Sequence, residues 1–163
     1  MTKAQTPKAK IRRKASRKPF HYTASGLSNV WLLNGFEIAE TPYGRGVRIK
    51  DADGLHTALA HAIAVSRQPM SPADLRFLRK HMGLSQNGLA RLLGCSDQSV
   101  ARWEKGKGDI VPSAERLVRL VALDFLGEDP DVRTALNGLA EMDEAEHGER
   151  RLRRWGETWK QAA

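Results

Sequence analysis

The residues with the clearest capacity for binding chemistry lie in one short stretch, LSQNGLARLLGCSDQSVARWEKGK, which covers residues 84–107. Helical periodicity places Val100 and Trp103 on the inner face of a helix in its second half. The outer face then carries hydrogen-bonding and charged side chains, namely Asp97, Gln98, Ser99 and Arg102. Carboxylate, amide, hydroxyl and guanidinium groups on one exposed face can recognise a partner through several directed hydrogen bonds.

Catalytic chemistry has no comparable set of residues in this sequence. No Ser/His/Asp arrangement, phosphate-binding glycine loop or matched pair of carboxylates stands out, so we expect a protein that is not an enzyme. His56 and His61 lie five residues apart in a helical pattern and point to different faces, and no cysteine or carboxylate cluster completes a four-ligand site. We therefore expect no metal and no cofactor. The single cysteine, Cys95, cannot form an internal disulfide and is interpreted as a small core side chain, with a redox switch as the less favoured alternative.

Short helices with clear start signals must position this polar face. Ser71 followed by Pro72 begins a helix that ends at Gly83. Ser85 and Ser96 begin two further helices, which Gly94 separates. These last two helices are only about two turns long and would be unstable alone. We therefore expect that they pack on each other at a defined angle and that this angle is what matters for function. A fourth apolar helix is predicted after Pro112.

The joint spacing of residue types in this stretch resembles the helix-turn-helix of the Cro/cI repressor family, also called the XRE family. The residues that carry the resemblance are Leu84, Ser85, Gln86, Leu89, Ala90, Leu93, Gly94, Ser96, Ser99, Val100, Trp103, Glu104, Gly106 and Lys107. With the flanking helices it extends from Ser71 to about Leu126. In this family the second helix of the pair lies in the DNA major groove and presents its N-terminal side chains to base edges, while the first crosses the backbone.

The resemblance implies a role for each exposed polar side chain. Base-reading residues are expected to be Asp97, Gln98, Ser99 and Arg102. Arg102 can form paired hydrogen bonds with guanine and Gln98 with adenine, whereas Asp97 can accept from cytosine or cap its helix. Phosphate contacts are expected from Gln86, Ser96, Lys105 and Lys107. Family members also commonly pair an arginine of the first helix with the glutamate that follows the recognition helix, and the matching residues are Arg79 and Glu104.

The formal net charge of +8 is concentrated at the N-terminus. Residues 1–19 contain Lys3, Lys8, Lys10, Arg12, Arg13, Lys14, Arg17 and Lys18 and no acidic residue, whereas the 19 basic residues that remain of the 27 are balanced by 19 acidic ones. Such a tail buries too little apolar surface to offset the entropy of ordering, so we expect it to be disordered. It favours polyanions, although a purely solubilising tail is an equal alternative.

Residues 20–68 are interpreted as a small α+β module. Asn34 and Gly35 stand between two β-prone runs at 30–33 and 36–38, which predicts a hairpin, and a third strand is expected at 46–50. An apolar stripe at Leu55, Leu59 and Ile63 predicts a helix over about 53–66 that covers this three-stranded meander.

Beyond Gly127 the sequence predicts a charged helical extension, residues 128–163. Its first part is strongly acidic, and Trp155 and Trp159 lie four residues apart, which would place them on one helical face. We interpret this extension as a solvated helix. Two functional alternatives are that the acidic stretch competes with DNA for the basic regions of the protein, or that the tryptophan helix docks on a partner protein.

Taken together, these patterns predict a mainly α protein with a λ-repressor-like helix-turn-helix domain at 69–127, preceded by the α+β module and the basic tail. We expect a transcription regulator, a repressor that binds a palindromic operator in double-stranded DNA as a homodimer. One alternative is the antitoxin of a toxin–antitoxin pair that also autoregulates its operon and holds a toxin; another is a general RNA- or chromosome-coating protein that acts through the tail. No apolar run reaches about 18 residues and no signal peptide is evident, so a cytoplasmic bacterial protein, nucleoid-associated when bound and without a membrane partner, is expected.

Overall fold

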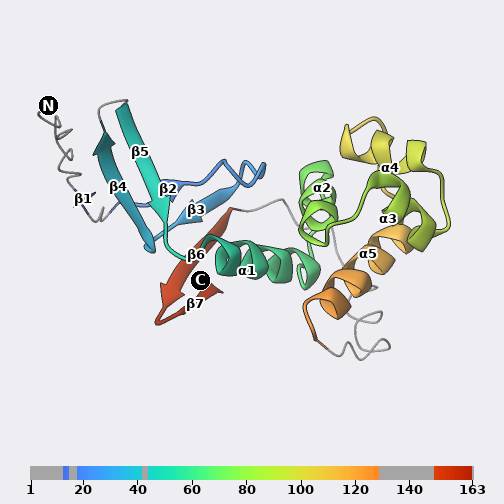
Figure 1. Cartoon of the computed structure of the whole chain (residues 1–163). Helices are drawn as coiled ribbons and strands as arrows, with labels where there is room; N and C mark the ends of the chain where they lie inside the picture. The colour runs from blue at the N-terminus through green and yellow to red at the C-terminus, as the bar shows by residue number, and fades with distance from the viewer. Residues whose placement is uncertain (1–12, 15–17, 42–43, 129–148, 163) are drawn as a thin grey trace, which may run out of the picture.

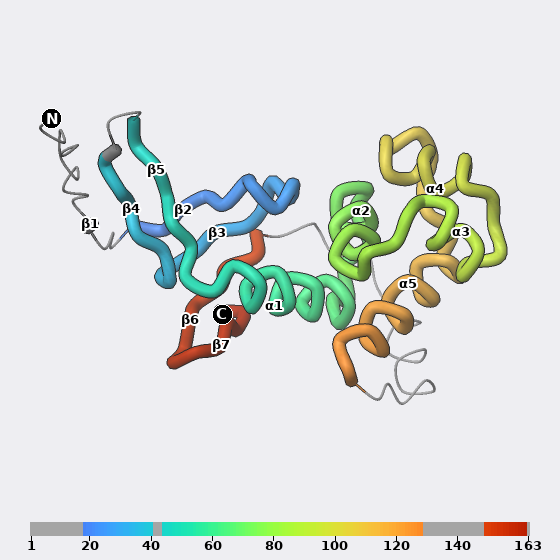
Figure 2. The backbone as a smooth tube through the Cα atoms, in the orientation of Figure 1, coloured from blue at the N-terminus to red at the C-terminus, as the bar shows by residue number. Residues whose placement is uncertain are grey.

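The computed structural model describes residues 13–14, 18–41, 44–128 and 149–162, which form two lobes (Figure 1). We call the first the β lobe, because it contains all the strands. The second, the helical lobe, consists of α2 (Pro72–His81), α3 (Gln86–Leu93), α4 (Asp97–Glu104) and α5 (Pro112–Phe125). Helix α1 (Ala52–Ala64) runs from one lobe to the other and packs against β7, α2 and α5 (Figure 2). No helix in the described ranges has both the length and the apolar composition needed to cross a membrane.

The β lobe contains two sheets. The three-stranded sheet is antiparallel, in the order β1 (Arg13–Lys14), β4 (Phe36–Thr41), β5 (Gly44–Ile49). The four-stranded sheet has the order β2 (Phe20–His21), β3 (Val30–Leu32), β6 (Arg150–Trp155), β7 (Thr158–Gln161). Its central pair, β3 and β6, is parallel, with Val30 opposite Arg150 and Leu32 opposite Leu152, so the far end of the chain completes a sheet begun near the start.

The hairpin predicted at Asn34 and Gly35 is wrong, and with it the three-stranded meander. Strands β3 and β4 belong to different sheets, and the residues between them form a corner. The Asn34 amide donates to the carbonyl oxygen of Arg154 at 3.0 Å and accepts from the Arg154 N–H, so it pairs with β6 instead of closing a local turn. Gly35 has a φ of +76°, and a Cβ there would overlap the indole ring of Trp159. A partner strand from far along the sequence replaces the local hairpin.

The predicted C-terminal helix is also wrong where the structure describes it. Residues 150–161 form the β6–β7 hairpin, which turns at Gly156 with a φ of +57°. Trp155 is 53% exposed and Trp159 only 6% exposed, because the two side chains point to opposite faces of the hairpin. The alternation of buried and exposed side chains along β6 has the two-residue period of a strand. The acidic part of the extension, 129–148, lies outside the described residues.

The expectation of a disordered basic tail is wrong for two of its residues. Arg13 and Lys14 form β1 and pair with Ile38 and Ala39 of β4. The structure also describes Lys18 and Pro19, and the other residues of the tail lie outside the described ranges.

The predicted helix starts are confirmed in the helical lobe. Ser71 caps α2 in a capping box with Asp74, and the Ser85 and Ser96 side chains cap α3 and α4. The helix predicted over 53–66 is α1, in which Leu55, Leu59 and Ile63 are buried. A single cluster of buried apolar side chains runs through both lobes, from Val30, Leu32 and Leu152 in the sheet to Leu78, Leu89, Val100 and Val118.

Two buried arginines connect the lobes through polar contacts. Arg119 of α5 is 1% exposed and donates to backbone carbonyls at the end of α1, those of Ile63 and Ala64, and to that of Gln68 at 2.7 Å. Its charge is balanced by Glu115 at 2.7 Å. A cation at the C-terminus of a helix satisfies the last carbonyls and interacts favourably with the helix dipole, so Arg119 fixes α5 to α1.

Arg150, the first residue of β6, makes the second connection. It is 6% exposed, and its guanidinium binds the Asp74 carboxylate of α2, with Nη1 2.9 Å from Oδ1 and Nη2 3.1 Å from Oδ2. Asn29, just before β3, accepts from the same guanidinium at 3.0 Å. The C-terminal hairpin is thus attached both to the sheet and to the helix that opens the helical lobe.

We expect Arg119→Met to destabilise the protein by about 3 kcal/mol, because it leaves Glu115 partly buried without its cation and removes the donors from the end of α1. Urea unfolding followed by circular dichroism measures this. Arg116→Met serves as the control, because Arg116 lies on the same helix and is partly exposed. Equal midpoints for the two variants would contradict the role assigned to Arg119.

Candidate nucleic-acid interface

Helices α3 and α4 are held at a sharp turn. Gly94 ends α3 in the left-handed conformation, with φ 67° and ψ 31°, which a residue with a side chain rarely adopts. Ser96 then caps α4, and its hydroxyl accepts from the Ser99 N–H at 3.1 Å. Only three residues, Gly94, Cys95 and Ser96, separate the helix ends, and this short connection restricts the angle between α3 and α4.

The inner face of α4 is anchored in the core. Val100 is fully buried, Glu104 is 4% exposed, and Trp103 packs partly buried against the core cluster. This leaves the opposite face of the helix to solvent. Asp97, Gln98 and Arg102 are exposed there, and Ser99 is partly exposed.

The exposed polar side chains differ in how far they are engaged inside the molecule. The Ser99 hydroxyl lies 2.9 Å from that of Ser96, within the cap. The Asp97 carboxylate accepts from the Gln98 N–H at 2.8 Å. The Arg102 guanidinium is turned towards the exit of the helix, with two long contacts of 3.4 Å to the Lys107 carbonyl. The side chains of Gln98 and Arg102 thus take no part in the hydrogen bonds that cap the start of α4.

A buried carboxylate fixes α4 to both of its neighbours. Arg79 of α2 binds Glu104 with two donors, Nε to Oε1 and Nη2 to Oε2, the latter at 3.0 Å. Gln86, the first residue of α3, donates from Nε2 to Oε2 at 3.0 Å. Burial raises the pKa of Glu104, but the hydrogen bonds from Arg79 and Gln86 and the charge of Arg79 outweigh it, so this pKa lies below its ordinary value.

Sequence reasoning missed a second arginine beside Glu104. The Arg76 guanidinium donates to the Glu104 backbone carbonyl at 2.6 Å and so caps the end of α4. Arg76 lies three residues before Arg79, and this spacing places both on one side of α2, which is the sequence signal that could have found it. The side-chain contact between Gln86 and Glu104 had no such signal.

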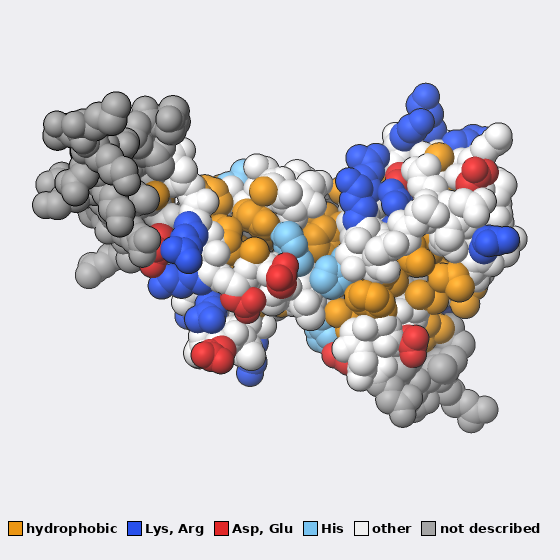
Figure 3. All heavy atoms as spheres, in the orientation of Figure 1, with side chains coloured by type: hydrophobic (Ala, Val, Ile, Leu, Met, Phe, Trp, Pro, Cys, Tyr) orange, Lys and Arg blue, Asp and Glu red, His pale blue; other side chains and the backbone are white. Residues whose placement is uncertain are grey.

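The expected phosphate-contacting residues surround this arrangement. Gln86 and Ser96 lie at the N-termini of α3 and α4, although the Gln86 amide already donates one hydrogen bond to Glu104. Lys105 and Lys107 are exposed at the exit of α4. Lys and Arg side chains gather over α2 and α4 on this face of the helical lobe (Figure 3). Of the four residues, the two lysines are exposed, whereas the Gln86 amide is engaged inside the molecule.

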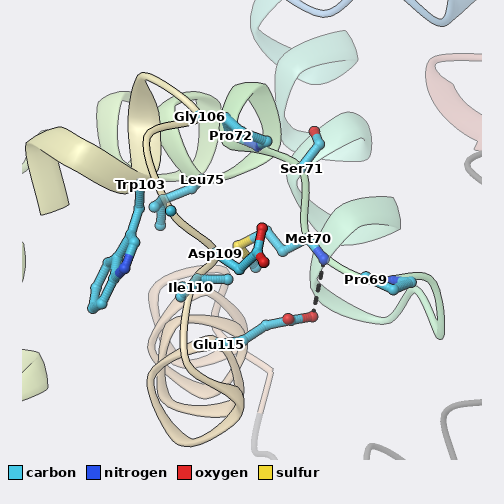
Figure 4. Close-up of a pocket in the computed structure, with 11 residues that line it drawn as sticks. Pro69, Met70, Ser71, Pro72, Leu75, Trp103, Gly106, Asp109, Ile110 and Glu115 are labelled. Carbon is cyan, nitrogen blue, oxygen red and sulfur yellow. Dashed lines mark hydrogen bonds between the residues drawn. The ribbon is translucent and has the colours of Figure 1, made fainter. Parts of the chain in front are cut away.

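A pocket of about 250 Å³ lies on the other side of α4, between the turn before α2, the loop after α4 and the start of α5 (Figure 4). Its walls include Met70, Leu75, Trp103 and Ile110, and the Glu115 carboxylate in its lining accepts from the Met70 N–H at 3.1 Å. Asp109 adds a second carboxylate. Apolar walls and carboxylates are unsuited to phosphate, so this pocket does not extend the basic surface. Among the described residues, no group of three or more His, Cys, Asp or Glu could hold a metal ion.

We expect Glu104→Gln to lower the free energy of unfolding by about 3 kcal/mol at pH 7, because the charge of Arg79 loses its partner. The pKa of Glu104 is depressed in the folded state, so its stabilisation is complete above the ordinary carboxyl pKa of about 4.3 and disappears as the pH falls through the lower folded-state pKa. The difference between wild type and variant should therefore shrink in acid. Urea titrations at several pH values measure it, with exposed Asp124→Asn as the control; a difference that does not change with pH would refute this account.

Residues 75–129, about a third of the chain, match a family model described as Helix-turn-helix. The matched segment begins in α2, contains the α3–α4 turn and runs past the end of α5. No curated protein and no solved structure matches the chain significantly. The match agrees with the resemblance carried by residues 84–107 and with the geometry of the two capped helices. The chain therefore contains a helix-turn-helix domain of the Cro/cI type, the kind of domain with which regulators bind DNA.

Proposed function

We propose that the protein is a transcription regulator that recognises a specific sequence in duplex DNA by placing α4 in the major groove. The observation that carries this proposal is the two-sidedness of α4. Its inner face is held by Val100 and Glu104, while Gln98 and Arg102 project from the outer face. A helix fixed on one side and polar on the other can present base-reading side chains without rearrangement, which limits the entropy lost on binding.

Base recognition is assigned to Asp97, Gln98, Ser99 and Arg102. Arg102 matches the two acceptors of guanine, and Gln98 matches the donor and acceptor of adenine. The Asp97 carboxylate would accept a hydrogen bond from cytosine N4, and it would disfavour a base that presents an acceptor at the same position. The Ser99 hydroxyl lies 2.9 Å from that of Ser96, and because its side chain is short, it would reach only a base edge close to the helix.

Phosphate contacts are assigned to Gln86, Ser96, Lys105 and Lys107. The first two lie at helix N-termini, where free N–H groups and the helix dipole favour an anion. The two lysines would hold the backbone beyond the end of the recognition helix. These contacts fix the position of the protein on DNA and add little sequence preference.

The regulator is proposed to act as a repressor and to bind a palindromic operator as a homodimer, with half-sites about 34 Å apart. Exposed apolar side chains on the helical lobe support self-association: Leu92 of α3 is 53% exposed and Leu117 of α5 is 42% exposed. Helices α3 and α5 pack on each other, so these side chains belong to one small helical unit. Pairing two such units would bury apolar surface and double the number of base contacts.

The alternative function is that of an antitoxin that autoregulates its own operon. It is favoured by the β lobe, which contains the two sheets, lies outside the matched helix-turn-helix segment and offers a second surface for a protein partner. Co-purification of a small protein encoded beside the gene, retained by the β lobe when α4 is altered, would support this function.

Selection of bound fragments from genomic DNA tests the main proposal. Gln98→Ala and Arg102→Ala should each remove about 1–3 kcal/mol of discrimination and relax the base preference at one position, because each removes a pair of hydrogen bonds. Lys107→Ala should instead weaken binding to all duplexes alike and flatten the salt dependence. Arg45→Ala on β5 is the control for loss of charge. Unchanged sequence preference in both α4 variants would refute base reading by this helix.

Sedimentation equilibrium tests the dimer. Leu117→Glu places a charge in the exposed apolar surface and should shift the protein from dimer to monomer without unfolding it, because the side chain is not in the core. Val47→Glu on β5, at 40% exposure, introduces the same charge on the β lobe and should leave the dimer intact. A monomeric wild-type protein, or equal association of both variants, would contradict this interface.

A further inference from the structure

The two faces of the four-stranded sheet differ in chemistry. The inner face carries Val30, Leu32, Leu152 and Trp159, which are buried against the core. Along β6 the alternate residues Arg151, Arg153 and Trp155 are exposed, so they belong to the opposite, outer face. The strand register sets their neighbours: Trp31 lies beside Arg151 and Lys160 beside Arg153. We call this exposed surface the outer sheet face.

Aromatic rings occupy two parts of the outer sheet face. On the side of β2, the exposed His21 ring stacks on Trp31, with ring centroids 4.6 Å apart and planes 17° from parallel. At the other end of β6, Trp155 is 53% exposed, and the Arg153 guanidinium lies 5.5 Å from the centre of its ring. An indole that remains half exposed at the tip of a hairpin contributes little to the core, and it leaves apolar ring surface available to a ligand.

Positive charges separate the two aromatic parts. Arg151, Arg153 and Lys160 are all exposed. Arg151 forms an ion pair with the Glu149 carboxylate at 3.4 Å, and both side chains are more than half exposed. Arg150, on the inner face, is by contrast neutralised by buried Asp74. The outer sheet face therefore combines positive charge with aromatic rings.

We propose that the outer sheet face binds single-stranded nucleic acid. Its basic side chains would follow the phosphate backbone, and Trp155 and the His21–Trp31 pair would stack with unpaired bases. Proteins recognise single strands through this combination on sheet surfaces, because every base has a flat face and every phosphate a negative charge. A duplex keeps its bases stacked inside and could use only the charges, and an acidic protein segment would not use the rings.

This surface lies on the β lobe, whereas the proposed duplex-binding helix lies on the helical lobe (Figure 1). The two sites share no residue, so one can fail in an experiment while the other holds.

Fluorescence anisotropy of the full-length protein with labelled oligo(U) and oligo(dT) of about 12 nucleotides tests the proposal at near-physiological salt. Trp155→Ala should weaken binding about tenfold, whereas Trp155→Phe should retain most of it, because a ring is kept for stacking. Arg153→Gln should weaken binding and reduce the slope of its salt dependence. Tighter binding of either oligonucleotide identifies RNA or DNA as the preferred single strand, and both results support the site.

Matched controls separate this site from general attraction of a basic protein for polyanions. Arg67→Gln removes one charge from an exposed position outside the sheet and should have little effect. Arg102→Ala should leave binding of single strands unchanged, and Trp155→Ala should leave binding of duplex fragments unchanged. The proposal is overturned if the wild-type protein binds neither oligonucleotide, or if wild type and Trp155→Ala bind them with equal affinity. It is also overturned if polyglutamate competes for the protein as effectively as an unlabelled oligonucleotide does. Equal weakening of duplex binding by Trp155→Ala would also overturn it.

Discussion

The desolvated carboxylate of Glu104 is the constraint on which the recognition helix depends. A buried charge is costly unless donors surround it, and the donors here come from different helices: Arg79 from α2 and Gln86 from α3. Satisfying this one group therefore fixes three helices relative to each other. Arg76 adds a donor to the backbone carbonyl of the same residue and holds the end of α4. The polar outer face of α4 is oriented by a polar contact on its inner side.

The same principle joins the two lobes. Arg119 satisfies carbonyls at the end of α1, and Arg150 satisfies the carboxylate that also belongs to the capping box of α2. A buried polar group must be hydrogen-bonded, so each of these contacts is satisfied in only one relative position of the elements it joins. Apolar packing alone would define that position less sharply. Because one core cluster also passes through both lobes, their relative position is held by packing and by directed bonds together.

Local signals in the sequence predicted the helical lobe well. Ser71, Ser85 and Ser96 begin helices, and Gly94 ends one, for reasons contained within a few residues of chain. The β lobe could not be predicted in this way, because its pairing is decided far along the sequence. Asn34 and Gly35 have the composition of a hairpin turn, but Asn34 pairs with Arg154, 120 residues away, and Gly35 accommodates Trp159. The residues of β6, RRLRRW, show no alternation of apolar and polar types, so its strand period appears only in the burial of the side chains. The four-residue spacing of Trp155 in β6 and Trp159 in β7 instead favoured a helix. In the candidate interface, the resemblance predicted the pairing of Arg79 with Glu104, whereas the contact of Gln86 with Glu104 could be seen only in the structure.

The parallel pairing of β3 with β6 has a consequence for how the protein is made. The helical lobe is built from neighbouring segments and can form soon after residue 128 is synthesised, since local contacts close quickly. The four-stranded sheet must wait until residues 150–161 have left the ribosome. During that interval the edge of β3 that later pairs with β6 is unpaired, and an unpaired strand edge can pair with another chain. The time between synthesis of residue 128 and synthesis of residues 150–161 should therefore affect how much of the protein reaches its native state.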